Sequence, residues 1–262
     1  MNGNPVSTRC GVPALPSLSF LVPALNEEGN IAPTINSLLR ALRPLNLDFE
    51  VIIVNDGSSD GTAAEAESLT AAHKEVRCLH NEQRMGLGFS YLRGIESATK
   101  SHFIYVPGDN TWPKESFDNL LRHFGRADVV TSFNTNPEVR EFSRRTVSTL
   151  YTLCVNLLFG YRMKYYNGLT IYPREFLMRG PIHTYGFGFQ AEALLKALVN
   201  GYSVVEVALP LDPRTVGKSK AVSVKNVASC AFTLMRLFWE LRLDPRQNWR
   251  PTTTPSRQAP PL

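Results

Sequence analysis

Val106-Pro107-Gly108-Asp109-Asn110 is the stretch that decides the fold of this 262-residue chain. It closes a run of strand-like residues that begins at His102 and leads into an acidic turn. Two similar strand ends lie upstream, at Phe20–Pro23 and at Val51–Asp56. Because the carboxyl ends of parallel strands meet at one edge of an open α/β sheet, Asp56 and Asp109 should lie together where such sheets bind ligands.

The bulk composition indicates a folded and mildly basic chain. Apolar residues make up 43% of the sequence, which excludes an intrinsically disordered protein. The 28 Lys and Arg exceed the 23 Asp and Glu, so the net charge is +5. This excess suits a ligand with phosphates, although a solvated basic surface explains it equally well. We expect no nucleic-acid partner.

Cysteine spacing and the distribution of apolar residues bear on the cellular compartment. The four cysteines are far apart, without a Cys-x-x-Cys pair, and predict free thiols in a reducing compartment. The N-terminus lacks the basic-then-apolar arrangement of a signal peptide. No apolar run reaches the length of about 18 residues that a membrane span needs. We therefore predict a cytoplasmic protein and leave peripheral contact with a membrane open.

Strands and helices alternate along the first half of the chain, which predicts an α/β fold with a mostly parallel sheet covered by helices on both faces. The predicted strands are Leu18–Pro23, Phe49–Asn55, Val76–His80, His102–Val106 and Asp128–Phe133. Helices are expected at about 28–43, 60–73, 88–99 and 113–124. Further along, we predict a helix at 140–159, a strand at Leu169–Tyr172, a helix at Phe189–Val199, a strand at Ser203–Leu209 and an amphipathic helix at 223–243.

The domain organisation follows from these patterns. Residues 17–243 are predicted to form one domain. Residues 1–16 are predicted to form a flexible tail, because they lack any periodicity. Residues 244–262 are rich in Pro, Thr and Arg without an apolar period, and we predict that they are disordered.

Polar motifs follow the first two strands. Val22–Glu28 ends the first strand with Pro23, which cannot donate to a sheet ladder, and helix capping alone would explain its acidic residues. Val54–Thr62 is more specific. A carboxylate at a strand end, followed by a Gly-Ser turn, would present Asp56 to a base or a ribose.

The order and spacing of these motifs resemble family 2 glycosyltransferases of the GT-A fold, over about residues 18–243. The chain is most similar to the dolichyl- and polyprenyl-phosphate sugar synthases. The resemblance rests on VPALNEEGN, VNDGSSDGT, the turn Asn81…Gly86-Leu87-Gly88, PGDN, and the distal Arg214-x-x-Gly217-x-Ser219-Lys220. It implies inverting transfer of a sugar from a nucleoside-diphosphate sugar, GDP-mannose or a UDP-sugar, to a polyprenyl or dolichyl phosphate.

The resemblance also implies roles for individual residues. Those implied for the nucleotide-sugar donor are Pro23, Leu25, Glu27, Asp56, Gly57, Ser58 and Gly108. Asp109 corresponds to the last aspartate of the family's Asp-x-Asp motif and would hold Mg²⁺ or Mn²⁺, with diphosphate oxygens completing the shell. Arg214 and Lys220 would hold donor or acceptor phosphate. Glu192 would face the acceptor and act as base toward a hydroxyl, although it could equally be an ordinary helix carboxylate.

Three departures from the family pattern leave the acceptor and the metal open. Pro107 replaces the first aspartate of the acidic motif. Phe133-Asn134 stands where an arginine is common, and Tyr166–Leu169 stands where an aspartate is common. Two alternatives therefore remain: transfer to a saccharide or another hydroxyl acceptor, and a catalytically inactive protein that binds nucleotide sugars.

Two of the predicted helices carry basic residues that could contact an anionic ligand or a membrane surface. Arg140, Arg144 and Arg145 open the long helix, where the helix dipole disfavours each cation by about 0.3–1 kcal/mol. They suggest a nearby acceptor phosphate or lipid headgroup, with a solvated face as an equal alternative. The last helix combines an apolar stripe with Arg236 and Arg242, which fits either an interfacial membrane helix or packing on a core.

Overall fold

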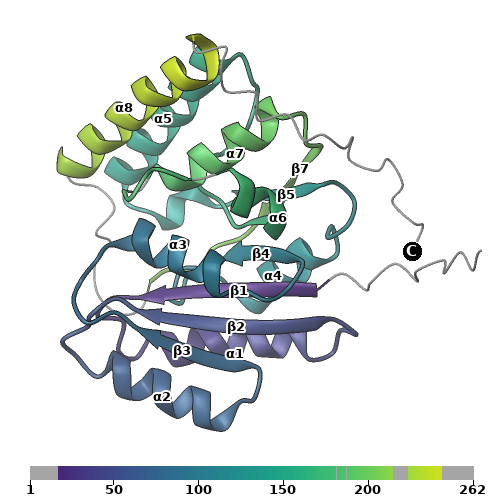
Figure 1. Cartoon of the computed structure of the whole chain (residues 1–262), viewed down its shortest axis with the longest axis vertical. Coiled ribbons are helices and arrows are strands. Elements are labelled where there is room, and N and C mark those ends of the chain that lie inside the picture. The colour runs from purple at the N-terminus through teal and green to yellow at the C-terminus, as the bar shows by residue number, and fades with distance from the viewer. Residues whose placement is uncertain (1–16, 181, 187, 215–223, 244–262) are drawn as a thin grey trace, which may run out of the picture.

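The computed structural model describes residues 17–180, 182–186, 188–214 and 224–243, and its centre is a seven-stranded sheet (Figure 1). The strands are β1 (Ser17–Ala24), β2 (Asp48–Asn55), β3 (Val76–His80), β4 (His102–Tyr105), β5 (Val129–Asn134), β6 (Thr170–Pro173) and β7 (Val204–Leu209). The predicted tails, 1–16 and 244–262, lie outside the described residues. The extent of the predicted domain stays a prediction.

The strand order of the sheet is β3-β2-β1-β4-β6-β5-β7, and it indicates the edge at which a ligand would bind. β1 pairs in parallel with both β2 and β4, and β5 pairs in parallel with β7. β6 alone among these strands runs antiparallel, between β4 and β5. The predicted mostly parallel sheet is confirmed. Since the chain leaves β1 toward β2 and β3 and returns to the other side at β4, the β1–β4 junction is a topological switch point, where open α/β sheets bind ligands.

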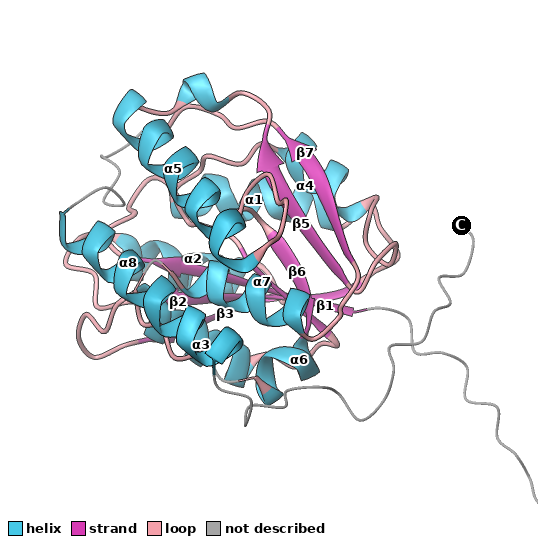
Figure 2. Ribbon diagram, turned by 90° about the horizontal axis from the view of Figure 1, so that it is seen from above, coloured by secondary structure: helices cyan, strands magenta, loops and turns pink. Residues whose placement is uncertain are grey.

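Helices cover both faces of the sheet, as predicted (Figure 2). One face carries α1 (Ile31–Leu42), α2 (Thr62–Ala72) and α4 (Lys114–Leu121). The other carries α3 (Leu87–Ser97), α5 (Phe142–Phe159), α6 (Arg174–Arg179), α7 (Phe189–Val199) and α8 (Val224–Phe238). A 3₁₀ turn, η1 (Pro137–Val139), precedes α5, and a π-helical turn, η2 (Trp239–Leu243), follows α8. α6 and η1 were not predicted, because each is too short to show a period, whereas the residues of η2 were predicted as the end of the last helix.

Two apolar cores, one on each face, explain why the strands read as apolar runs. In β1, Leu18, Phe20 and Val22 pack with α1, α2 and α4, whereas Leu21 packs with α3 and α7 on the opposite face. Successive side chains of a strand point to opposite faces, so a strand buried on both sides needs apolar residues at nearly every position. Val51–Val54 of β2 shows the same pattern, with all four residues fully buried.

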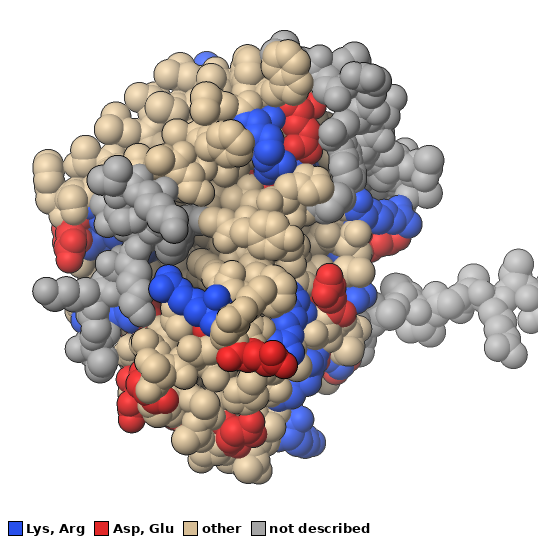
Figure 3. Space-filling model, turned by 60° about the vertical axis from the view of Figure 1, so that its left-hand side comes forward, with Lys and Arg blue, Asp and Glu red and all other residues tan. Residues whose placement is uncertain are grey.

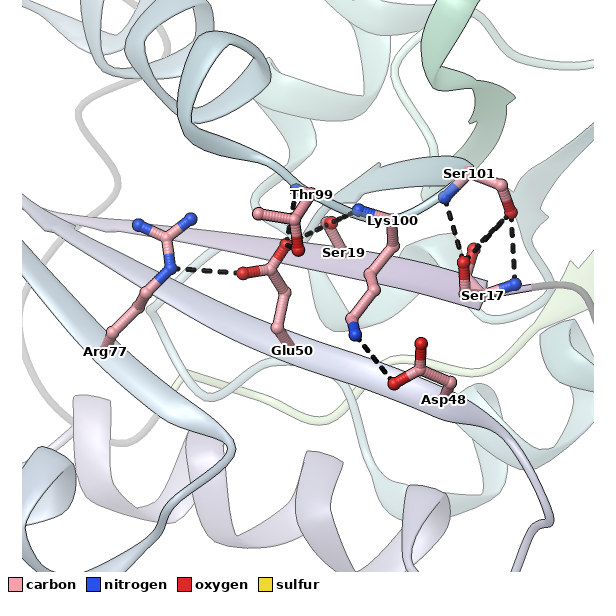
Figure 4. A network of polar contacts seen from close by, with 8 residues as sticks. All are labelled: Ser17, Ser19, Asp48, Glu50, Arg77, Thr99, Lys100 and Ser101. Atoms are coloured by element: carbon pink, nitrogen blue, oxygen red, sulfur yellow. Dashed lines mark hydrogen bonds and ion pairs between the residues drawn. The ribbon is translucent and has the colours of Figure 1, made fainter.

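A polar network closes the amino ends of the strands (Figure 4). Glu50 accepts hydrogen bonds from Ser19 Oγ at 2.7 Å, from Thr99 N at 2.6 Å and from Arg77 Nε at 3.1 Å. Burial acts to raise the pKa of Glu50, but these hydrogen bonds outweigh it and hold the pKa below its ordinary value. Ion pairing of Lys100 with Asp48 at 2.6 Å extends the network. These contacts occupy the amino ends of the strands, and the cleft opens at their carboxyl ends.

Candidate active site

A cleft of about 590 Å³ opens at the carboxyl ends of β1, β2 and β4, at the switch point of the sheet. The predicted site residues that line it are Pro23, Leu25, Glu27, Asp56, Gly108, Asp109 and Arg214. Figure 3 turns the left-hand side of Figure 1, toward which β1 points, to the viewer. Lys and Arg side chains are interspersed with Asp and Glu on this side, so the net positive charge does not gather in one patch here.

Asp56, at the end of β2, is a buried carboxylate held in a fixed orientation. It accepts hydrogen bonds from Asn81 Nδ2 at 2.7 Å, from the backbone amide of Met85 at 2.8 Å and from that of Gly86 at 2.8 Å. Gly86 adopts a φ of 98°, which glycine allows and other residues resist. The turn after β3 therefore positions Asp56 at the cleft wall.

Gly57 and Ser58 do not lie among the described lining residues of the cleft, and contact of these two residues with the donor stays a prediction. Gly57 has a φ of 68°, and a Cβ atom there would collide with the backbone of Gln83 and Arg84. Ser58 Oγ accepts from the backbone amide of Asn26 at 3.0 Å. Gly57 therefore allows close approach of the loops after β2 and β3, and Ser58 joins the loops after β1 and β2.

Asp109 lies on a tight turn after β4, where Asn110 has a left-handed backbone with a φ of 53°. The amide of Asn110 donates to Thr34 Oγ1 at 3.0 Å, and Thr111 Oγ1 donates to Asp109 Oδ1 at 2.8 Å. The Asp109 side chain is 18% exposed. The turn thus presents a partly accessible carboxylate to the cleft.

Arg214 links the two carboxylates on either side of it. Its Nη2 lies 2.5 Å from Glu27 Oε2 and its Nη1 lies 3.7 Å from Asp109 Oδ2. Burial raises the pKa of Glu27 above its ordinary value, and the negative charge of Asp109 adds to this, although Arg214 opposes both. A guanidinium in this place can bind phosphate oxygens bidentately. Lys220, the second cation predicted for this loop, lies outside the described residues.

Glu192 on α7 lies outside the cleft lining and is fully buried, which overturns its predicted role as a base. It accepts hydrogen bonds from the backbone amides of His183 and Thr184, and it pairs with Lys196 at 2.8 Å and with Arg236 at 2.8 Å. Burial acts to raise its pKa, but Lys196 and these hydrogen bonds lower it to about 2. A carboxylate this strongly paired cannot accept a substrate proton near neutral pH.

The opposite wall of the cleft combines cations with apolar side chains. Arg140 and Arg144 line it at the start of α5. Burial lowers the pKa of Arg144, and the neighbouring positive charge of Arg140 lowers it further. Apolar lining residues from α5 and α8 follow: Val147, Leu150, Cys154, Val227, Ala231 and Leu234. The cleft therefore has one end suited to phosphates and one suited to an apolar group.

The apolar wall continues onto the outer surface of the molecule. Leu150 and Val227 line the cleft and are also 56% and 44% exposed. Other large apolar residues exposed on α5, α8 and the start of η2 are Phe142, Leu153, Leu157, Leu158, Phe232, Met235 and Trp239. Within the described chain, no helix has both the length and the apolar content to cross a membrane.

Comparison with known proteins assigns the family. The sequence profile described as "Glycosyl transferase family 2" matches residues 19–186, which include β1 to β6 and most of the cleft. The chain belongs to glycosyl transferase family 2. The predicted resemblance is thereby confirmed at the level of the family.

This glycosyltransferase is similar in sequence to two curated proteins. It is 27% identical over 237 residues to the polyprenol monophosphomannose synthase of Mycolicibacterium smegmatis. The match covers 86% of this chain and 88% of the relative. It is 26% identical over 245 residues to the glycosyltransferase AglD of Haloferax volcanii. That match covers 90% of this chain but only 39% of AglD.

Solved structures share the fold of this glycosyltransferase. Glucosyl-3-phosphoglycerate synthase from Mycobacterium tuberculosis, in complex with phosphoglyceric acid, superposes with a TM-score of 0.64 at 19% identity, over 86% of this chain and 79% of that one. The same enzyme in complex with Mg²⁺ and UDP gives a TM-score of 0.62 at 18% identity, over the same shares of the two chains. These likenesses confirm the predicted GT-A fold.

Several residues around this family 2 cleft were not assigned roles from the sequence. Asn81 holds Asp56, and Tyr105 and Tyr165 line the cleft. Burial raises the pKa of Tyr105 well above its ordinary value, and the charge of Asp109 adds to this. Away from the cleft, the pairing of Lys196 with Glu192 left a signal in the sequence, because the two residues are four positions apart and such pairs share one helix face.

The donor set at Asp109 fits a hard divalent cation. Its carboxylate oxygens are of the type that Mg²⁺ and Mn²⁺ prefer, and it is partly exposed to the cleft. Pro107, which replaces the other carboxylate of the family motif, also lines the cleft but offers no side-chain oxygen. A cation held by Asp109 would receive one carboxylate from this turn, and a chelating diphosphate would have to supply most of its other oxygens.

Proposed function

We propose that this family 2 glycosyltransferase moves a hexose from a nucleoside-diphosphate sugar to a polyprenyl or dolichyl phosphate, with inversion at the anomeric carbon. GDP-mannose and UDP-sugars are both candidate donors. The observation that carries the proposal is the two-part cleft. Asp109 and Arg214 lie at its polar end, and an apolar wall from α5 and α8 runs out to the surface. An acceptor with a phosphate head and a hydrocarbon chain suits both parts.

The reaction needs positioning and charge stabilisation more than proton transfer. An oxygen of the acceptor phosphate attacks the anomeric carbon, a new carbon–oxygen bond forms, and the bond to the donor diphosphate breaks. The phosphate is already anionic near neutral pH, so no base is required. Arg140 and Arg144 would orient it, while Arg214 would bind the diphosphate.

A divalent cation fits the same scheme. When bound by Asp109, Mg²⁺ or Mn²⁺ supplies positive charge next to the leaving diphosphate. Arg214 lies close enough to Asp109 to stabilise the negative charge of the same diphosphate oxygens. Asp56, which three hydrogen bonds hold in place, would contact the base or the ribose of the nucleotide.

The structure makes a hydroxyl acceptor less favourable. A hydroxyl needs a general base, and Glu192 is buried in ion pairs away from the cleft. Of the carboxylates that line the described part of the cleft, Asp109 belongs to the proposed metal site. Asp56 accepts three hydrogen bonds from the protein. Glu27, whose pKa burial raises, is paired with Arg214.

The proposal predicts the fate of a labelled sugar. The full chain should first be screened against GDP- and UDP-sugars, with and without Mn²⁺, for stabilisation against heat. With the donor that stabilises most, radiolabel should move into the organic phase when polyprenyl phosphate is added. Free polyprenol, which has a hydroxyl in place of the phosphate, is the matched control and should accept little label.

Two results would overturn the proposal. Label that stays water-soluble with every lipid, but reaches a saccharide, would indicate a hydroxyl acceptor. Donor binding without turnover, for all sugars and metals tested, would indicate an inactive nucleotide-sugar-binding protein.

We further propose that the exposed apolar residues of α5 and α8 contact a membrane surface, where a polyprenyl phosphate resides. Leu157→Glu and Phe232→Glu should each weaken binding to phosphatidylcholine vesicles about tenfold or more. Burying such a side chain contributes about 1.5–3 kcal/mol, and 1.4 kcal/mol is a factor of ten. Both residues are at least 66% exposed, so the fold should persist.

The matched control for this membrane prediction is Leu45→Glu. Leu45 is 44% exposed and lies between α1 and β2, away from α5 and α8. Equal vesicle binding by all three variants and the unmodified chain, in a flotation assay, would contradict the proposed contact. Location in the cytoplasm stays a prediction.

A further inference from the structure

A second pocket of about 330 Å³ adjoins the cleft, between α5, the end of β5 and the segment after α5. Arg140, Arg144, Ser148 and Tyr165 line both spaces, so the pocket begins where the cationic wall of the cleft ends. It extends away from Asp56 and Asp109, which do not line it. The second pocket therefore shares Arg140 and Arg144 with the cleft, whereas Arg145 and Lys164 line the second pocket alone.

The lining of the second pocket is strongly cationic. Arg145 and Lys164 join the two shared arginines, and no Asp or Glu occurs among its described lining residues. Lys164 Nζ lies 4.1 Å from the centroid of the Phe133 ring, so the ammonium is held against the pocket wall. Glu206 accepts from the backbone amide of Lys164 at 2.7 Å but does not line the pocket. Four basic side chains therefore line one small space, which favours the binding of an anion.

Neutral polar groups add the donors that an oxyanion needs. Ser148, Thr149 and Thr152 contribute hydroxyls to the lining. The Asn134 side-chain oxygen is buried without a hydrogen-bond partner among the described residues, although Asn134 lines the pocket. Such an acceptor would be satisfied by a hydroxyl on the ligand. The chemistry therefore favours a phosphate that carries a polyol.

Exposed apolar side chains of α5 lie at the second pocket and next to residues that line it. Leu153 lines it and is 51% exposed, and Leu157, one turn further along α5, is 75% exposed. Phe142, against which Arg145 packs at 5.4 Å from the ring centroid, is 74% exposed. Basic groups beside exposed apolar residues are typical of surfaces that meet anionic lipid headgroups.

From these observations we infer that the second pocket binds the phosphate of an anionic phospholipid headgroup, separately from the acceptor phosphate in the cleft. The inference does not depend on the sugar, the nucleotide or the acceptor. A free phosphate has the same charge chemistry, and the apolar rim is the feature that favours the headgroup.

The test measures binding of the full chain to vesicles of phosphatidylcholine, with and without phosphatidylglycerol. The unmodified chain should prefer the anionic vesicles. Arg145→Glu and Lys164→Glu should each reduce that preference about tenfold or more. Arg126→Glu is the matched control and should keep the preference, because it makes the same charge change in the exposed segment before β5, at the opposite end of that strand.

Three outcomes would overturn the inference. The first is unchanged preference in both pocket variants. The second is an equal loss in Arg126→Glu, which would indicate a response to net charge alone. The third is a response to free phosphate alone. In that case inorganic phosphate or glycerol phosphate would protect the unmodified chain, but not the pocket variants, against heat, and the unmodified chain would show no preference for anionic vesicles. Donor binding in the thermal screen should be the same for all variants, which separates this test from that of the transfer reaction.

Discussion

Asp109→Ala should lower sugar transfer by about 10²–10³-fold, the order of effect expected when one fixed charge-stabilising group is removed from an active site. Among the described residues of the turn after β4 that line the cleft, Asp109 is the only one with a carboxylate. Its loss would leave the charge of the leaving diphosphate to Arg214. Activity should also become insensitive to chelation of divalent cations.

Asp109→Asn separates the charge from the shape of the side chain. The amide can still accept a hydrogen bond from Thr111 Oγ1, so the turn should keep its conformation. Transfer should nevertheless fall nearly as far as in Asp109→Ala, because a neutral amide is a poor ligand for a hard cation. The measurement is the initial rate of label transfer over a titration of Mn²⁺ and of donor.

Asp118→Asn is the control for this experiment. Asp118 lies on α4, which follows the same strand, and it is absent from the cleft lining. Its transfer rate should match that of the unmodified chain. Unchanged turnover in Asp109→Ala would remove Asp109 as the metal ligand, whatever the outcome for the acceptor.

Lys196→Met should destabilise the fold by about 3–5 kcal/mol, the usual cost of breaking a buried ion pair. Lys196 is 2% exposed and pairs with Glu192 at 2.8 Å and with Glu240 at 3.3 Å. Arg236 completes the set by pairing with the same two carboxylates. Without Lys196, two buried carboxylates would share one guanidinium. For a chain of this size, the midpoint of thermal unfolding should fall by roughly 6–20 °C.

Lys114→Met provides a matched control for this variant. Lys114 pairs with Asp118 at 2.6 Å across the same four-residue helical spacing, but both side chains are partly exposed. Exposed pairs contribute about 0.2–1 kcal/mol, so its unfolding midpoint should change little. Similar losses in the two variants would contradict the assignment of a buried ion-pair cluster.

The same cluster predicts a dependence of stability on acid. Since the pKa of Glu192 is lowered from 4.5 to about 2, its ionised form is favoured in the folded state. Its contribution should be complete above pH 4.5 and should be lost as the pH falls toward 2. A Glu192→Gln variant should lack that part of the acid transition in a denaturant titration series.

The cluster also explains why Glu192 matters without touching a substrate. Its oxygens hold the amides of His183 and Thr184. The next residue, Tyr185, accepts from the amide of Gly88 at 3.2 Å, at the start of α3. Gly86, two residues earlier, donates to Asp56. The buried ion pairs thus support the loop that positions the predicted nucleotide-binding carboxylate.

The sequence by itself determined the strands, most of the helices and the edge of the sheet where the cleft lies. Those features are local: apolar runs mark β1, β2 and β4, and the polar residues after each run mark its carboxyl end. The sequence alone therefore predicts that Asp56 and Asp109 lie at one rim of the sheet.

Only the tertiary structure decided which side chains line the cleft and which are buried elsewhere. The antiparallel insertion of β6, the apolar wall from α5 and α8, and the burial of Glu192 depend on contacts between distant segments. Arg236 reaches Glu192 across 44 residues of sequence. A local pattern shows that a helix carries a carboxylate, but its surroundings, and hence its charge state and role, are set by the side chains that pack against it.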